Sequence, residues 1–303
     1  MPARTKAQPH IAIVGTGNLG SALATALRAA NYTIDEIVSR ANVASIKRAR
    51  ALAREVRASA ATIYRAQLRA GIVWFCVPDR EIKGAAQSLS QAADWKGKIA
   101  LHSSGALTSD ALQILRERGA AVASVHPLMT FVRGSRPSLK GVPFALEGDA
   151  AALRAARRLV LNLRGEPFTI QKRGKEAYHA WGMFSSPLFV ALLAAAERVA
   201  MTAGIPRHEA SKKMMPILRQ TLANYERIGA AQSFSGAIAR GDVETVKKHL
   251  HVLQGVRGAW QVYVALAHSA LIDLPVKDRS GLKKVLPPTK LRGLSGEKSG
   301  GIG

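Results

Sequence analysis

A glycine-rich turn near the start of the chain has the residue types and the spacing that bind phosphate groups. Gly15, Gly17 and Gly20 form a Gly-x-Gly-x-x-Gly pattern between an apolar strand and a helix. The first glycine permits a tight turn, the second lets the backbone approach a pyrophosphate, and the third lets the helix pack closely on a sheet. Free backbone N–H groups at the positive end of the helix would face the phosphates. The sequence therefore predicts a dinucleotide site formed by Gly15, Thr16, Gly17, Asn18, Leu19 and Gly20.

The end of the second predicted strand indicates which dinucleotide fits. In such sites an acidic residue there binds the ribose 2′-hydroxyl of NAD, whereas arginine accommodates the 2′-phosphate of NADP. Ser39 and Arg40 end this strand, while Asp35 and Glu36 fall earlier in it. Lys47 and Arg48 on the following helix either add to the positive field or are ordinary surface charges. We therefore predict NADP rather than NAD, with Ser39 and Arg40 in the cofactor site.

Polar residues also follow two later strands, at the sheet edge where open α/β folds bind ligands. Ser103 and Ser104 follow one strand, and His126 ends another. Their hydroxyl and imidazole groups suit a substrate carboxylate or phosphate, although serines before glycine also cap helices and form turns. We expect Ser103, Ser104 and His126 to bind substrate, and Val77 and Pro78 to border the cofactor.

The elements that must position these residues follow from the hydrophobic pattern. Short apolar runs alternate with helical patterns from residue 9 to about 172, which predicts a mainly parallel, doubly wound Rossmann sheet. The predicted strands are 10–14, 34–39, 60–63, 71–77, 98–102, 120–125, 142–146 and 165–170. The predicted helices are 18–30, 41–57, 79–92, 108–117 and 149–163.

The pattern becomes purely helical after Gly174. A long helix is predicted from Lys175 to Ala203, a second from Pro206 to near Gly229, a third from Asp242, and a fourth that carries Trp260. These helices make a smaller all-helical domain. A first helix this long and apolar often packs against a second subunit, so we expect a homodimer.

We therefore divide the chain into four parts. They are a disordered N-terminus at 1–8, a dinucleotide-binding domain at 9–172, a helical substrate and dimerisation domain at 173–274, and a disordered tail at 275–303. The tail is assigned as disordered because it is basic and rich in glycine and proline.

Composition excludes some classes of protein and keeps others open. The formal net charge of +24 favours nonspecific binding of polyanions, but no nucleic-acid-binding motif accompanies it. The longest apolar run, 187–196, is about half of a bilayer crossing, so no membrane helix is expected. The single cysteine, Cys76, lies in an apolar strand and is interpreted as a buried hydrophobe in a reducing cytoplasm.

The chain resembles a group of bacterial Rossmann-like proteins of unassigned function. The similarity rests on the stretches at 99–107, 124–131, 143–148, 175–180 and 236–242. Such proteins resemble the wider superfamily of 6-phosphogluconate dehydrogenase, 3-hydroxyisobutyrate dehydrogenase and pyrroline-5-carboxylate reductase. The resemblance implies an NAD(P)-binding domain, a helical and usually dimerising domain, and a substrate cleft between them.

The resemblance also implies a catalytic pair. The β-hydroxyacid dehydrogenases carry a lysine followed four residues later by asparagine, and Lys175 and His179 have this spacing. Residues four apart share one helix face. A lysine whose pKa is lowered by burial acts as a general acid or base, and histidine titrates near neutrality or holds a substrate oxygen. The change from Asn to His alters the chemistry that this pair can perform. Trp181 stands where a smaller residue is expected, and it would reshape the substrate pocket if it faced the cleft. Core packing is the other interpretation of Trp181.

These features together predict a cytoplasmic NADP-dependent oxidoreductase. It would transfer a hydride between nicotinamide and a small carbonyl, hydroxyl or imine substrate, with Lys175 and His179 as catalytic residues and without a metal. Two alternatives remain open, namely an NAD(P)-binding sensor or scaffold without turnover and a nucleic-acid-binding protein.

Overall fold

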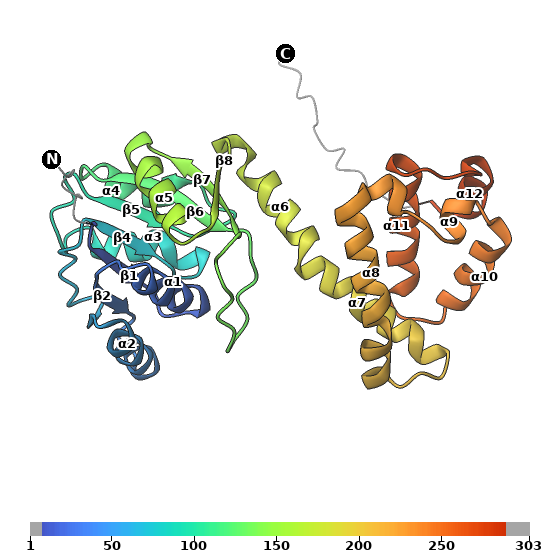
Figure 1. The fold of residues 1–303 in the computed structure, drawn as a ribbon, viewed down its shortest axis with the longest axis horizontal. Coiled ribbons are helices and arrows are strands. Elements are labelled where there is room, and N and C mark those ends of the chain that lie inside the picture. Colours follow the sequence, from blue (N-terminus) through green and yellow to red (C-terminus); the bar gives the residue numbers. More distant parts are fainter. Residues whose placement is uncertain (1–7, 289–303) are drawn as a thin grey trace, which may run out of the picture. The chain divides into compact units, whose positions relative to one another are not determined.

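The computed structural model describes residues 8–288 and begins with an eight-stranded sheet (Figure 1). The strands are β1 Ile11–Val14, β2 Ile34–Ser39, β3 Ser59–Thr62, β4 Ile72–Phe75, β5 Ile99–His102, β6 Ala121–Pro127, β7 Pro143–Gly148 and β8 Glu166–Thr169. They lie in the order β3-β2-β1-β4-β5-β6-β7-β8, and β6 and β7 form the antiparallel pair. All eight predicted strands are confirmed.

Helices cover both faces of this sheet because the side chains of each strand alternate between two apolar layers. The helices are α1 Asn18–Ala29, α2 Val43–Val56, α3 Asp79–Leu89, α4 Gln113–Arg116, which continues the 3-10 turn Ser109–Leu112, and α5 Ala150–Asn162. In β1, Ile11 and Ile13 pack on one face with α1, α2 and α5, while Ala12 and Val14 pack on the other with α3 and α4. The doubly wound fold class is therefore confirmed.

The strand order places a crevice between β1 and β4. The connection after β1 leads to β2 on one side, and the chain returns through β4 on the other side. Ligands of open α/β sheets bind at such a switch point, beyond the carboxyl ends of the strands. The glycine turn, which follows β1 at Val14, lies at this point.

The helix α6, Lys175–Ser185, groups with the sheet and not with the helices that follow it. The chain divides into two compact units after Ser186, later than the predicted boundary at 172–173. The physical reason is burial, because Lys175 and Tyr178 on α6 are buried within the first unit. The single predicted helix from Lys175 to Ala203 is interrupted at Ser186, whose backbone angles are φ −134° and ψ −80°.

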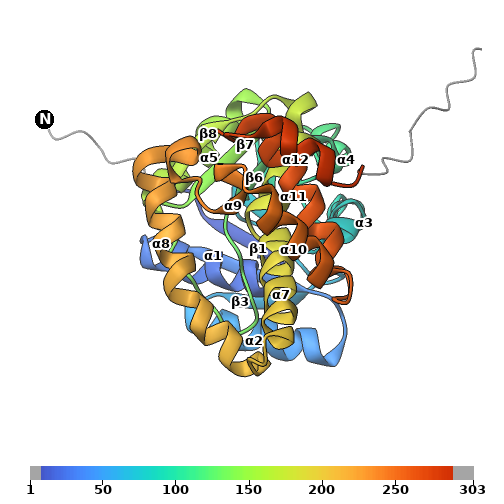
Figure 2. The same ribbon diagram turned by 90° about the vertical axis from the view of Figure 1, so that its right-hand side faces the viewer.

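The second unit is helical, as predicted. It contains α7 Pro187–Thr202, α8 Arg207–Ser233, α9 Ala237–Arg240, α10 Val243–Leu253, α11 Ala259–Asp273 and α12 Arg279–Val285. Helix α8 is broken by a kink at Gly229, whose backbone is non-helical (φ 75°, ψ 176°), so the predicted end of the helix near Gly229 is confirmed as a break. The short helix α9 was not predicted. Asp242 caps α10 by accepting a hydrogen bond from the backbone N–H of Thr245. Figure 2 shows α7 and α8 side by side.

The prediction of a disordered tail from 275 is wrong for its first part. Helix α12 lies there, and Leu282 and Leu286 are buried in a core with residues of α10 and α11. The basic and glycine-rich composition of this segment predicts disorder, but Leu282 and Leu286 are four residues apart and therefore share one helix face. The rest of the predicted tail, 289–303, and residues 1–7 of the predicted disordered N-terminus lie outside the described residues.

Helices α7 and α8 expose an apolar surface. Only Ala195 of α7 and Ala210 of α8 are buried. The exposed apolar side chains on these two helices are Leu188, Val190, Met201, Met215, Ile217, Leu222 and Tyr225. Among the described residues, the stretch Lys172–Thr202, which Ser186 interrupts, is the one whose length and composition would allow it to cross a membrane, and 6% of its apolar window is buried.

Candidate functional site

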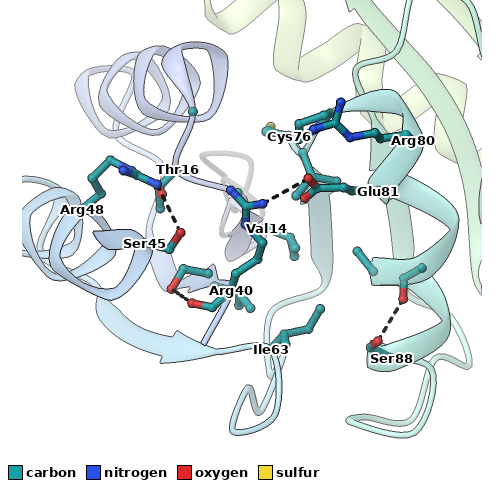
Figure 3. A pocket seen from close by; sticks show the side chains of 18 of the residues that line it. Val14, Thr16, Arg40, Ser45, Arg48, Ile63, Cys76, Arg80, Glu81 and Ser88 are labelled. Atoms are coloured by element: carbon teal, nitrogen blue, oxygen red, sulfur yellow. Dashed lines mark hydrogen bonds and ion pairs between the residues drawn. The ribbon is translucent and has the colours of Figure 1, made fainter. Parts of the chain in front are cut away.

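A pocket of about 910 Å³ lies at the glycine turn (Figure 3). Its lining comes mainly from the ends of β1, β2 and β4, from the starts of α1 and α2, and from α3, with Ile63 and Arg133 beside them. The lining includes eight of the ten predicted cofactor residues, namely Gly15, Thr16, Gly17, Asn18, Ser39, Arg40, Val77 and Pro78. Leu19 and Gly20 do not line it. The structure thus gathers residues that lie far apart in the sequence into one cavity of a size that suits a dinucleotide.

The three glycines of the turn have different physical roles. Gly15 has φ +112°, and a Cβ there would lie 2.6 Å from the carbonyl oxygen of Cys76. A Cβ on Gly20 would lie 2.2 Å from the carbonyl oxygen of Gly15, so α1 packs on the turn through this glycine. A Cβ on Gly17 would meet no atom within 4 Å. Gly17 therefore leaves its space open at the pocket, whereas Gly15 and Gly20 are needed by the fold.

Two arginines line the side of the pocket near β2. Arg40 forms an ion pair with Glu81 of α3 at 3.2 Å, and Arg48 donates to the hydroxyl of Ser45 at 3.1 Å (Figure 3). Ser45 and Arg48 both lie on α2, and both line the pocket together with Arg40. This arrangement presents cationic groups where the ribose 2′ substituent of a dinucleotide is bound in this fold.

The two acidic residues of β2 have other partners. Asp35 accepts a hydrogen bond from His10 at 2.7 Å. Glu36 is buried and accepts from the backbone N–H groups of Gln67 and Leu68. Neither carboxylate lines the glycine pocket.

A second group of polar side chains joins β6 to α6. Ser124 and His126 lie two residues apart on β6 and share one face of the strand, and Lys175, Tyr178 and His179 share one face of α6. The Nζ of Lys175 donates to the Oγ of Ser124, and this hydroxyl donates to the carbonyl oxygen of Ser104 at 3.1 Å. Lys175 is 1% exposed and Ser124 is 0% exposed.

The surroundings of Lys175 adjust its charge. Burial lowers the pKa of the Lys175 ammonium from 10.5 to about 8, and the nearby carboxylates of Glu147 and Asp79 partly oppose this change. Glu147 is itself buried and accepts two hydrogen bonds from Ser109, through its backbone N–H and its hydroxyl, both at 2.7 Å. A lysine with this pKa exchanges its proton near neutral pH, as general acid–base chemistry requires.

The imidazole of His126 lies between Tyr178 and Gly105. Its Nδ1 and the Tyr178 hydroxyl are 2.7 Å apart. A Cβ on Gly105 would lie 2.9 Å from both the Nε2 of His126 and the Cδ2 of His179, so the lack of a side chain lets both rings approach. Burial, with smaller effects from the charges of Lys175 and His179, lowers the pKa of His126 to about 4.

The two predicted serines are buried and hydrogen-bonded. The Oγ of Ser103 accepts from the indole N–H of Trp74 at 2.8 Å. The Oγ of Ser104 donates to Asp79 at 2.7 Å and accepts from the backbone N–H groups of Ala106 and Leu107. Since Asp79 follows Pro78 of the pocket lining, this bond ties the cofactor pocket to the β5 loop. Their predicted contact with substrate stays a prediction.

Ser124 and Tyr178 were not selected from the sequence. Ser124 lies inside a predicted apolar strand, and its alternation with His126 is the signal that would have found it. Tyr178 lies three residues after Lys175 and therefore on the same helix face, and this spacing is the signal that would have found it. Trp181 is 53% exposed, and its ring lies 6.1 Å from that of Tyr178, so it is not a core residue.

The remaining reactive groups have other roles. Burial raises the pKa of the Cys76 thiol to about 12, so this cysteine stays protonated, in line with its interpretation as a buried hydrophobe. Within residues 8–288, no three His, Cys, Asp or Glu side chains gather in a way that suits a metal ion.

Comparisons with known proteins match both halves of the chain. A family model described as a Rossmann-like domain matches residues 3–127, and one described as a domain of unknown function, DUF2520, matches residues 142–270. No curated protein matches the sequence.

Solved structures share the fold over most of the chain. The Thermotoga maritima protein TM1727 is 26% identical with a TM-score of 0.68, covering 91% of this chain and 98% of its own. The Bacteroides fragilis protein BF3122, provisionally described as an NADP oxidoreductase, is 18% identical with a TM-score of 0.72, covering 86% and 97%. A reductive aminase from Aspergillus terreus, in complex with NADPH, is 18% identical with a TM-score of 0.63, covering 91% and 99%. The chain thus combines a Rossmann-like domain with a DUF2520 domain that follows it.

Proposed function

We propose that this protein is an NADP-dependent oxidoreductase that transfers a hydride between nicotinamide and a small carbonyl, hydroxyl or imine substrate. The observation that carries the proposal is Lys175, which is buried against Ser124 and has a pKa of about 8. It belongs to the same compact unit as the glycine pocket. A proton-exchanging group in the dinucleotide-binding unit is what hydride transfer to a carbonyl or imine needs.

The pocket residues fit NADP. Gly17 leaves space for a pyrophosphate, and Arg40 and Arg48 offer donors to a 2′-phosphate. Ser39 lines the same side of the pocket, and its hydroxyl donates to the carbonyl oxygen of Arg40 at 3.1 Å. Asp35 and Glu36, the acids that could hold an unphosphorylated ribose, are bonded elsewhere. The A. terreus structure of the same fold contains NADPH. When bound, the cofactor would supply or accept the hydride.

The residues of this chain would handle the proton and the orientation of the substrate. The Lys175 ammonium gives a proton to the oxygen or nitrogen of the reduced group, and its amine takes that proton in the reverse reaction. His179, one turn further along α6, assists it, and His126 holds the substrate beside them. Ser103 and Ser104 shape the loop that carries Gly105 and are retained as substrate contacts in this proposal.

The test is turnover. Purified protein is mixed with NADPH and a panel of small ketones, keto acids and cyclic imines, and NADPH absorbance is followed. Steady oxidation with at least one substrate is expected. Tight NADPH binding without turnover on a broad panel would favour the sensor or scaffold. Salt-sensitive binding of nucleic acid that survives loss of the glycine turn would favour a nucleic-acid-binding protein.

The pH dependence of turnover should follow Lys175. Burial favours the neutral amine, so the pKa lies at about 8 and the ammonium predominates below that value. The rate of reduction should therefore be level below about pH 8 and fall as pH rises above it. Ser124→Ala removes the acceptor of the ammonium proton and should move this inflection to lower pH. Rate profiles of the two proteins measure the shift, and an unchanged inflection would contradict the assignment.

Cofactor preference should depend on Arg40. Arg40→Ala removes one charge-assisted hydrogen bond to a 2′-phosphate, so the Kd for NADPH should rise by about ten- to a hundredfold. The Kd for NADH, which lacks that phosphate, should change by less than about threefold. Lys47→Ala is the matched control, because Lys47 is exposed on the neighbouring helix and does not line the pocket. Equal losses for both cofactors would contradict the role of Arg40.

We also propose that the protein is a cytoplasmic homodimer in which the apolar surface of α7 and α8 packs against a second copy of the chain. Its exposed side chains include Val190, Ile217 and Leu222, which are 61%, 68% and 55% exposed. Large apolar side chains exposed on two packed helices are typical of an interface. Light scattering should give twice the mass of one chain, and Ile217→Glu should give the mass of one. Val43→Glu, at an 85% exposed site on α2, is the control and should remain dimeric. A monomeric wild type would contradict this.

A further inference from the structure

Tyr178 and His126 form a pair with a defined geometry. Proton transfer by Lys175 does not by itself require this pair. The Tyr178 hydroxyl lies 2.7 Å from Nδ1 of His126, and the two rings meet edge to face at 84° with centroids 5.5 Å apart. Tyr178 is 8% exposed, and Phe168 and Trp181 pack against its ring. These rings hold the Tyr178 ring in place beside His126.

The hydrogen-bonding options of the two groups determine the direction of this bond. Burial raises the pKa of Tyr178 to about 12, so its hydroxyl keeps a proton. Within residues 8–288 the hydroxyl has one hydrogen-bond partner, Nδ1 of His126, and no buried side-chain nitrogen or oxygen lacks a partner. If Nδ1 carried a proton, the proton of the hydroxyl would have no protein acceptor. Donation from the hydroxyl to Nδ1 gives this proton an acceptor, which is the arrangement that hydrogen-bond satisfaction favours.

The other nitrogen of the ring is not fully enclosed by the protein. Nε2 of His126 lies against Gly105 beside the His179 ring and has no hydrogen-bond partner among the described residues. Because no unpartnered side-chain nitrogen there is buried, Nε2 is accessible to solvent. The titratable groups around it are Lys175 and His179 on α6 and His102 on β5.

We propose that Tyr178 is a positioning residue that holds His126 in the Nε2–H tautomer, so that His126 offers a hydrogen-bond donor to its ligand. The ligand group that it takes is then an acceptor, a carbonyl or carboxylate oxygen. That consequence for the substrate rests on the proposed function, whereas the tautomer does not. His126 orients and polarises the oxygen, and the proton comes from Lys175.

The test is the tautomer itself, read by NMR of protein with ¹⁵N-labelled histidine, in which the two ring nitrogens have different shifts when protonated or bare. Near neutral pH, His126 should show a protonated Nε2 and a bare Nδ1, and its signals are assigned by their loss in His126→Gln. His102 is an internal reference, since its Nε2 donates to the Thr108 carbonyl and its Nδ1 accepts from the Ser104 N–H. A protonated Nδ1 in His126 of the unmodified protein would overturn the proposal without any variant.

Two variants test whether Tyr178 is the cause. Tyr178→Phe removes the hydroxyl and should give a mixture of both tautomers for His126. The matched control is Tyr263→Phe, because Tyr263 lies 3.1 Å from Nδ1 of His249 with rings at 84°, in the second unit. It should leave the His126 signals unchanged. A pure Nε2–H tautomer in Tyr178→Phe would overturn the role of Tyr178. Because none of these spectra needs turnover, a failure of the proposed enzyme activity is recognised separately.

Discussion

Replacing Lys175 by methionine is expected to lower kcat/KM for reduction by about 10²- to 10⁴-fold, the usual contribution of a general acid. Methionine has a similar length and is apolar, so it fills the buried space of the lysine stem. Ser124 keeps its own bond to the Ser104 carbonyl, so no buried hydroxyl loses its acceptor. The Kd for NADPH should stay within about twofold, because Lys175 does not line the glycine pocket.

Stopped-flow measurement of NADPH oxidation in one turnover, together with fluorescence titration of NADPH, separates these two quantities. Lys96→Met is the control, since Lys96 is exposed on the first unit, and it should behave like the unmodified protein. If Lys175→Met kept its turnover, Lys175 would not be the proton donor. If it lost NADPH binding to the same degree, the lysine would act on the cofactor pocket.

Adding one methyl group at Gly17 is expected to weaken NADPH binding by at least about tenfold while leaving the fold intact. In Gly17→Ala the new Cβ meets no protein atom within 4 Å, and the backbone has an ordinary φ of −72°. The methyl group would lie in the open pocket, where the pyrophosphate must approach the backbone. Thermal unfolding should therefore remain unchanged and affinity should fall.

Two other glycines make this result specific. Gly71→Ala also places its Cβ in open space but lies outside the pocket, so neither stability nor affinity should change. Gly20→Ala places its Cβ 2.2 Å from a backbone oxygen, so its Tm should fall. Isothermal titration and thermal denaturation of the three variants measure both effects. If the Gly17→Ala protein bound NADPH normally, the hypothesis that the pyrophosphate binds at this turn would be contradicted.

The strands and most helices could be predicted because their signals are local. Buried strands alternate between two apolar layers, and Asp242 precedes α10 as a cap whose side chain the structure shows bonded to Thr245. The errors arose where local signals were misleading. Ser186 interrupts a helix in an apolar run, and α12 is stabilised by two leucines that pack against distant helices in spite of its basic composition.

The candidate site was only partly predictable. Lys175, His179 and His126 were chosen from the resemblance and from their places at strand and helix ends. Their partners were not, because the bond from Lys175 to Ser124 joins residues 51 positions apart and the one from Tyr178 to His126 joins residues 52 apart. Pairing across such separations depends on how α6 packs on β6.

By itself, then, the sequence determined the glycine turn, the order of strands and helices, and the basic end of β2, since each depends on neighbouring residues and on backbone geometry. Only the tertiary structure decided that Lys175 is buried and therefore has a pKa of about 8. It likewise decided that Asp35 and Glu36 are bonded away from the pocket, and that two imidazoles lie against Gly105. Burial, charge and close approach are properties of surroundings that folding assembles from distant parts of the chain.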